Sequence, residues 1–138
     1  MPAYMPCEAN LATTLVAQIA AATATQKDPI FTAPRKCVVL EIALTPQTAT
    51  TGNNTNTKTL NVVNVGPAGA GTTQISTTPL PTGTNLVAGQ KQALALNAAN
   101  AAGHAMAAGE TLSLETVLVG TGVIVGPHLV SIVWAPLE

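Results

Sequence analysis

The chain has 138 residues, and only 8% of them are Asp, Glu, Lys or Arg, against about 25% in an ordinary soluble domain. The formal net charge of −1 argues against binding to nucleic acids and other polyanions. No charged residue lies between Lys58 and Lys91 or between Glu115 and Glu138. A surface with so little charge has few means of staying unassociated, so we expect other protein to cover much of it.

Leu, Ile, Val and Phe together contribute 34 residues, a share above the roughly 20% below which chains tend to stay disordered. We therefore expect a folded chain with one domain over residues 11–138, preceded by an N-terminal arm over residues 1–10. The apolar residues are scattered among Thr, Asn, Gly and Pro, without the run of about 18 that spans a bilayer. The sequence therefore predicts no transmembrane helix and no membrane partner.

The arm carries apolar and proline side chains without any periodicity. These residues are Pro2, Tyr4, Met5 and Pro6. Such a segment either orders on a partner or frays, and both interpretations stay open.

The next segment, Leu11 to Ala24, is apolar and rich in alanine and threonine. No basic residue precedes it, whereas a signal peptide carries positive charge in front of its apolar part, so we do not expect secretion by this route. Leu11, Leu15 and Ile19 are spaced as on one face of a helix. The threonines favour extended structure, and we favour a strand over the helix.

Apolar residues alternate along Lys36–Leu44, which is the pattern of a half-buried strand. This alternation places Val38, Leu40, Ile42 and Leu44 on one face. Lys58 to Val65 alternates less cleanly, because Val62 and Val63 are adjacent. We expect a strand there too, with a bulge at the two valines.

Shorter extended segments follow in the second half of the chain. We expect edge segments at Gln74–Thr77 and Asn85–Ala88, and a strand over Gln90–Leu96 with Leu94 and Leu96 facing inward. The alanine-rich stretch from Ala98 to Ala108 fits a short helix or a loop with one helical turn, and both remain open.

Two stronger strands close the chain. Thr111–Val119 alternates, with Leu112, Leu114 and Leu118 on one face, and Leu129–Trp134 is apolar on both faces, as a central sandwich strand is. Glycine and proline clusters separate all these segments. The sequence therefore predicts an all-β fold, an antiparallel β-sandwich of jelly-roll type with about eight short strands.

No motif indicates a reaction centre. The Gly-x-Gly pairs at Gly69 and Gly120 lack the third glycine of a dinucleotide-binding loop, so we expect turns there. Glu41, Glu110 and Glu115 would have to converge in a cleft to act as an acid/base pair. In a chain so poor in charge we expect them to face solvent or a cation instead. We therefore predict a protein that is not an enzyme and needs no cofactor.

Histidines and cysteines are too few for a convincing metal site. We expect His104 and His128 to be surface or turn residues, without the partners of a catalytic triad. Cys7 and Cys37 would pair only if the fold brought their Cα atoms within about 7 Å, and we interpret them as two unrelated thiols.

The chain has one Trp, one Tyr and one Phe, which is little for stacking sugars or single-stranded nucleic acid. We expect Trp134 to be a core or interface anchor. Asn53-Asn54-Thr55 matches the glycosylation pattern, and we interpret it as a polar turn.

Three segments together resemble structural proteins of tailed bacteriophages. "DPIFTAPRKCVVLEIAL", from Asp28 to Leu44, is similar to their opening, where a short strand ends in an Ala-Pro turn and leads into a long apolar strand. "AAGETLSLETVLVGTG" and "HLVSIVWAPLE", which begin at Ala107 and His128, resemble their last two strands. The matches cover about a third of the chain, and the alanine-rich insert before Gly109 has no counterpart.

The resemblance implies a capsid decoration, or cement, protein. Such a protein is a β-sandwich, commonly a homotrimer, that sits on the exterior of the virion head and strengthens the shell by binding the major capsid protein. It implies capsid contact for the arm residues Pro2, Tyr4, Met5 and Pro6. A head-fibre or tail adaptor module, a glycan-binding β-sandwich and, more remotely, a jelly-roll hydrolase are the alternatives.

Overall fold

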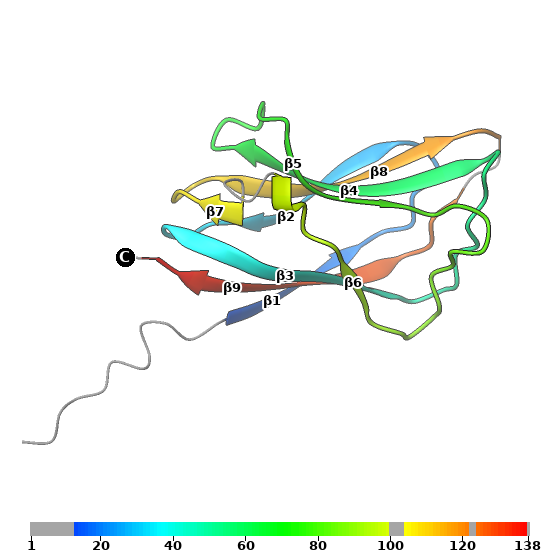
Figure 1. Ribbon diagram of the computed structural model, residues 1–138, viewed down its shortest axis with the longest axis horizontal. Coiled ribbons are helices and arrows are strands. Elements are labelled where there is room, and N and C mark those ends of the chain that lie inside the picture. Colours follow the sequence, from blue (N-terminus) through cyan, green and yellow to red (C-terminus); the bar gives the residue numbers. More distant parts are fainter. Residues whose placement is uncertain (1–12, 100–103, 122–123, 138) are drawn as a thin grey trace, which may run out of the picture.

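The computed structural model describes residues 13–99, 104–121 and 124–137. Two antiparallel sheets lie face to face as the two layers of a sandwich (Figure 1). The described residues form nine strands: β1 (Thr13–Ile19), β2 (Gln26–Thr32), β3 (Cys37–Pro46), β4 (Thr57–Gly66), β5 (Thr73–Pro79), β6 (Gln92–Leu94), β7 (Ala105–Met106), β8 (Thr111–Val119) and β9 (His128–Pro136).

The strand order follows a simple rule of nesting. One sheet has the order β1-β9-β3-β6, with β7 also paired to β3, and the other has the order β2-β8-β4-β5. Apart from β7, the pairs run outward from the hairpin β4·β5 through β3·β6 and β2·β8 to β1·β9. The chain is therefore one long hairpin rolled into two sheets, which is the jelly-roll arrangement. The predicted all-β, antiparallel jelly-roll sandwich is confirmed.

The core lies between the two sheets and is built from the inward residues of both. Side chains that are fully or almost fully buried include Ile42, Leu44, Leu60, Leu112, Leu114 and Ile132. Phe31 of β2 and Trp134 of β9 contact each other across the layers, with ring centroids 5.7 Å apart. Burying a large apolar side chain stabilises a fold by about 1.5–3 kcal/mol, so these alternating residues hold the sheets together.

The strand favoured within Leu11–Ala24 is confirmed over Thr13–Ile19; residues 11 and 12 lie outside the described part. It pairs with β9 in one unbroken register, from Thr13 opposite Trp134 to Ile19 opposite His128. The expected strands at β4, β5, β8 and β9 are also present. Between β6 and β8, Ala105–Met106 is the extended segment β7, while residues 100–103 lie outside the described part.

The predicted inward face of β3 is wrong in its first half. Val38 is only half-buried and Leu40 is 50% exposed, whereas Val39, Ile42 and Leu44 are buried. The cause is a bulge: Val39 and Glu41 oppose adjacent residues of β9, so Leu40 is an extra residue between them. A bulge reverses the alternation beyond it, which is why Val39 and Ile42 face the same way.

The expected irregularity at Val62 and Val63 is present, since the register of β4 with β5 shifts between these two residues. The extra residue belongs to the partner strand, because Val62 opposes Ser76 and Val63 opposes Gln74. Ile75 is thus the inserted residue. It is fully buried, so the bulge turns an apolar side chain of an edge strand into the core.

Two other expected segments are shorter than the sequence suggested. The strand expected over Gln90–Leu96 covers only Gln92–Leu94, and Asn85–Ala88 contributes a single bridge, between Leu86 and Thr50. A turn at Gly89, which has a φ of 73°, separates the two segments. Its N–H donates to the carbonyl of Pro46, so the chain bends where a continuous strand would run straight.

No helix in the described part of the chain is long and apolar enough to cross a membrane.

Candidate interaction surface

The outer face of the sheet that contains β1, β9 and β3 carries almost no charge. On β9, Val130 and Ile132 are buried in the core, so the alternate residues point outward. We define the uncharged face by seven outward positions. They are Thr14, Val16 and Gln18 of β1, Leu129, Ser131 and Val133 of β9, and Thr45 of β3, which the register places side by side.

One charged strand residue, Glu41, borders this face, because it lies opposite Val133. Lys91 neutralises it, with Nζ 2.6 Å from Oε1. Both side chains are substantially exposed, and such a surface pair contributes only about 0–1 kcal/mol to stability. Its effect here is on the surface: two of the few charges of the molecule cancel at the rim of the uncharged face.

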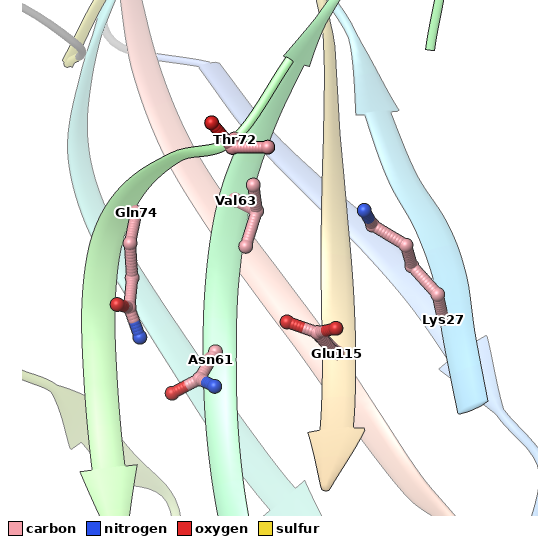
Figure 2. A pocket seen from close by; sticks show the side chains of 6 residues that line it. All are labelled: Lys27, Asn61, Val63, Thr72, Gln74 and Glu115. Atoms are coloured by element: carbon pink, nitrogen blue, oxygen red, sulfur yellow. The ribbon is translucent and has the colours of Figure 1, made fainter. Parts of the chain in front are cut away.

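The outer face of the other sheet has a different character. Lys27, Glu115 and Asn61 lie opposite one another on β2, β8 and β4, and the row ends at Thr77, whose Oγ1 donates to Asn61 Oδ1 at 2.6 Å. Beside this row is a shallow hollow of about 160 Å³ (Figure 2). Its six lining residues include no aromatic side chain, which is the platform a sugar-binding site usually provides.

The three candidate carboxylates do not meet. Glu41 and Glu115 lie on opposite outer faces of the sandwich, since their chain neighbours Ile42 and Leu114 both point into the core. Glu110 is engaged in the loop before β8, where its Oε2 accepts hydrogen bonds from Asn64 Nδ2 at 3.2 Å and from the N–H of Ala107 at 3.0 Å. An acid/base pair made of these residues is therefore not formed.

His128 is buried, with 1% of its surface exposed, so the prediction of a surface or turn histidine is wrong for this residue. As the first residue of β9 it shares the inward face with Val130 and Ile132. Nδ1 lies 3.1 Å from the carbonyl of Gly126, and we assign the proton to Nδ1. Burial lowers the pKa of His128, an effect that the Gly126 carbonyl and the charge of Asp28 partly offset.

Cys37 is also buried. Burial and, to a smaller extent, the Glu110 carboxylate raise the pKa of its thiol, so it is a poor nucleophile. Cys7 lies outside the described residues. Within the described ranges, no group of three or more His, Cys, Asp or Glu side chains is placed to hold a metal ion.

Trp134 lies on the inward side of β9, opposite Thr13 and Val39. It is half-buried and packs against the core cluster, with its ring on Phe31. The four arm residues Pro2, Tyr4, Met5 and Pro6 lie outside the described part of the chain.

The Asn53-Asn54-Thr55 segment forms a closed polar turn. Asn53 Oδ1 accepts the N–H groups of Thr55 and Asn56, at 2.7 and 2.9 Å. Asn54 and Thr82 exchange two hydrogen bonds between their side chains and backbone N–H groups, at 3.0 and 3.2 Å. These contacts tie the loop after β3 to the loop after β5.

The sequence shows where charge is missing along the chain, but not that the uncharged segments form one face of a sheet. The signal was present in two segments, because Thr13–Ile19 and His128–Pro136 contain no Asp, Glu, Lys or Arg. Only the pairing of these distant segments joins them into one face.

Comparison with known proteins adds little to this description. No protein-family model matches the chain, and no curated protein matches it in sequence. Among solved structures it is similar to chains of infectious bursal disease virus, strains Gx and Gt, with 11% and 12% identity and a TM-score of 0.41 in each case, over 92% of this chain. The chain spans about a third of their length, 32% and 33%. A likeness at this level carries no argument about function.

Proposed function

We propose that the protein is a non-enzymatic structural component of a virion, which binds the major capsid protein on the exterior of a phage head and stabilises the shell. The observation that carries this proposal is the uncharged face of β1, β9 and β3. A face of Thr, Ser, Gln, Val and Leu side chains is suited to burial against other protein. Covering it would desolvate no unpaired charge, and the short side chains lose little conformational entropy.

The jelly-roll fold is compatible with this role but does not assign it. Jelly rolls serve in viral capsids and also in lectins, and a fold alone does not specify function. The resemblance of three segments to tailed-phage structural proteins favours the capsid role. The hollow of Figure 2 gives the glycan-binding alternative little support, because no aromatic side chain lines it.

The proposed mechanism is surface complementarity without chemistry. A specific contact buries about 800 Å² on each partner, and the uncharged face would supply its centre. Residues 2–10, including Tyr4 and Met5, would add a second contact by ordering along the capsid protein. Joining neighbouring capsid subunits through one decoration molecule would stabilise the shell against internal pressure.

The test is binding to empty shells assembled from the major capsid protein of the virus that encodes this chain, measured by co-sedimentation. Ser131→Glu places a charge at the middle of the uncharged face, and we expect an affinity about tenfold or more lower, because burying an unpaired charge costs several kcal/mol. The matched control, Thr77→Glu, adds the same charge to the exposed face of the other sheet and should bind like the parent protein.

Far-UV circular dichroism would establish that both variants keep the sheet structure. Removal of residues 2–10 should also weaken binding if the arm contacts the shell. Unchanged binding of Ser131→Glu would contradict the role of the uncharged face. Absence of shell binding by the parent protein, with binding to a tail or fibre protein instead, would assign the adaptor role.

A further inference from the structure

We infer that β1 is a pairing strand between two copies of this chain, which joins their sheets antiparallel about a two-fold axis at Val16. The inference does not depend on a virion role. It rests on the chemistry of the four sheet edges and on the order of residues along one of them.

The β1 strand is an open edge of its sheet, since β9 is its one neighbour among the described strands. Alternate residues of an edge strand direct their N–H and C=O groups away from the sheet, where another strand can bind them. β1 has seven residues in a single register, with no bulge, no proline and no charge. None of the usual features that prevent strand addition is present.

The other edges are protected. β2 carries Lys27, Asp28 and Pro29 and has a bulge after the proline. β5 ends at Pro79, and part of its free edge is occupied, because the N–H of Asn97 donates to the carbonyl of Ile75 at 2.7 Å.

The edge opposite β1 consists of β6, which is three residues long and follows Lys91, and β7, which is two residues long; both pair with β3. Charge, proline, bulges and short length are the features by which natural sheets avoid edge-to-edge association. Of the four edges, only β1 lacks them all, which makes it the edge where a second chain can add.

The occupant is identified by the self-complementary order of the exposed residues. Thr14, Val16 and Gln18 all point outward and are exposed, and Val16 is 59% exposed. Antiparallel pairing centred on Val16 brings the two valines together and places Thr14 of each copy opposite Gln18 of the other. The apolar Val16 therefore faces Val16, and the polar Thr14 faces Gln18. These pairs matter because side chains directly opposite each other on a sheet interact most strongly.

Other registers of the two β1 strands would pair their side chains less favourably. Because side chains alternate between faces, a shift by one residue would oppose exposed positions to core positions. Centring the pair on Ala17 would oppose Val16 to Gln18 and leave Thr14 without an opposite residue. The Val16-centred register uses the full length of β1 and produces one continuous sheet through both subunits.

The test is the mass of the full chain in solution by light scattering, over a range of protein concentrations. We expect a dimer at high concentration. Val16→Lys would bring two like charges directly opposite each other, and we expect a monomer at the same concentration. Val119→Lys is the matched control: this valine is 57% exposed at the end of β8, and its variant should stay dimeric.

Mixing Val16→Lys with Val16→Glu tests the register, because only two-fold pairing at this residue puts Lys opposite Glu. We expect the mixture to form a mixed dimer while each variant alone is monomeric. As an independent pair, Thr14→Lys with Gln18→Glu in one chain should dimerise, and Thr14→Lys with Gln18→Lys should not.

A parent protein that is monomeric at every concentration would overturn the inference. So would a trimer, as the resemblance implies, if Val16→Lys leaves its mass unchanged. These outcomes can be distinguished from failure of the shell-binding proposal. A β1 dimer that binds no shell would contradict only the shell-binding proposal, and a monomer that binds the shell would contradict only the β1 inference.

Discussion

His128 is a buried residue whose ionisation state depends on the fold. Its Nδ1 proton is directed at the Gly126 carbonyl, while Nε2 is buried without a hydrogen-bond partner among the described residues. Protonation of Nε2 would place a positive charge in the core beside no acceptor. The lowered pKa of His128 reflects this cost, and the neutral imidazole is the form that the fold stabilises.

The sign of the resulting pH dependence follows from proton linkage. The unfolded chain binds a proton at the ordinary histidine pKa of about 6.5, whereas the folded chain does so only at lower pH. The free energy of unfolding should therefore be fully retained above pH ~6.5 and fall as the pH drops below it. His128→Asn offers an amide donor to the Gly126 carbonyl and does not titrate.

Urea unfolding of parent and variant between pH 7.5 and 5.5, roughly one unit either side of the ordinary pKa, would measure the effect. The loss of stability on acidification should be smaller in His128→Asn than in the parent protein. Equal losses would show that His128 is not the titrating group.

At the scale of single elements, the bulge in β3 has a consequence that a deletion can test. Without Leu40, residues Val39 and Glu41 become neighbours, and Val39, Ile42 and Leu44 then alternate regularly while still facing the core. Because β9 opposes Val39 and Glu41 with adjacent residues, the pairing needs no other change. Deletion of Leu40 should therefore retain the fold, at a cost of about 1 kcal/mol.

Deletion of Ala43 is the matched control. It turns the fully buried Leu44 outward and brings Thr45 inward, which should cost about 2–5 kcal/mol or prevent folding. Thermal unfolding by circular dichroism would compare the two deletions. A larger loss of stability on deletion of Leu40 than of Ala43 would contradict the assigned bulge.

The bulge also explains where sequence patterns fail. Strands such as Thr111–Val119 were predictable because period-two alternation is a local property. The direction in which Val38 and Leu40 point could not be predicted, since an inserted residue is defined only by its pairing with the partner strand. The short β6 likewise depends on the tertiary contact at Gly89, which no pattern in its own residues reveals.

At the scale of the whole molecule, the jelly-roll class could be predicted from many short strands and frequent turns, and the missing charge predicted a covered surface. The location of the uncharged face could not be predicted, because β1 and β9 are separated by most of the chain and meet only through the nested pairing. The burial of His128 could not be predicted for a related reason. His128 faces inward together with Val130 and Ile132, but this follows only once β9 is known to begin at residue 128.

The most direct test of a shell-binding role is electron microscopy of empty capsid shells saturated with the full chain. Bound protein at a fixed set of symmetry-related positions on the shell exterior, with the uncharged face of β1, β9 and β3 against capsid protein, is the expected result. Shells that remain bare at saturating protein concentration, or protein bound with the uncharged face exposed to solvent, would contradict it.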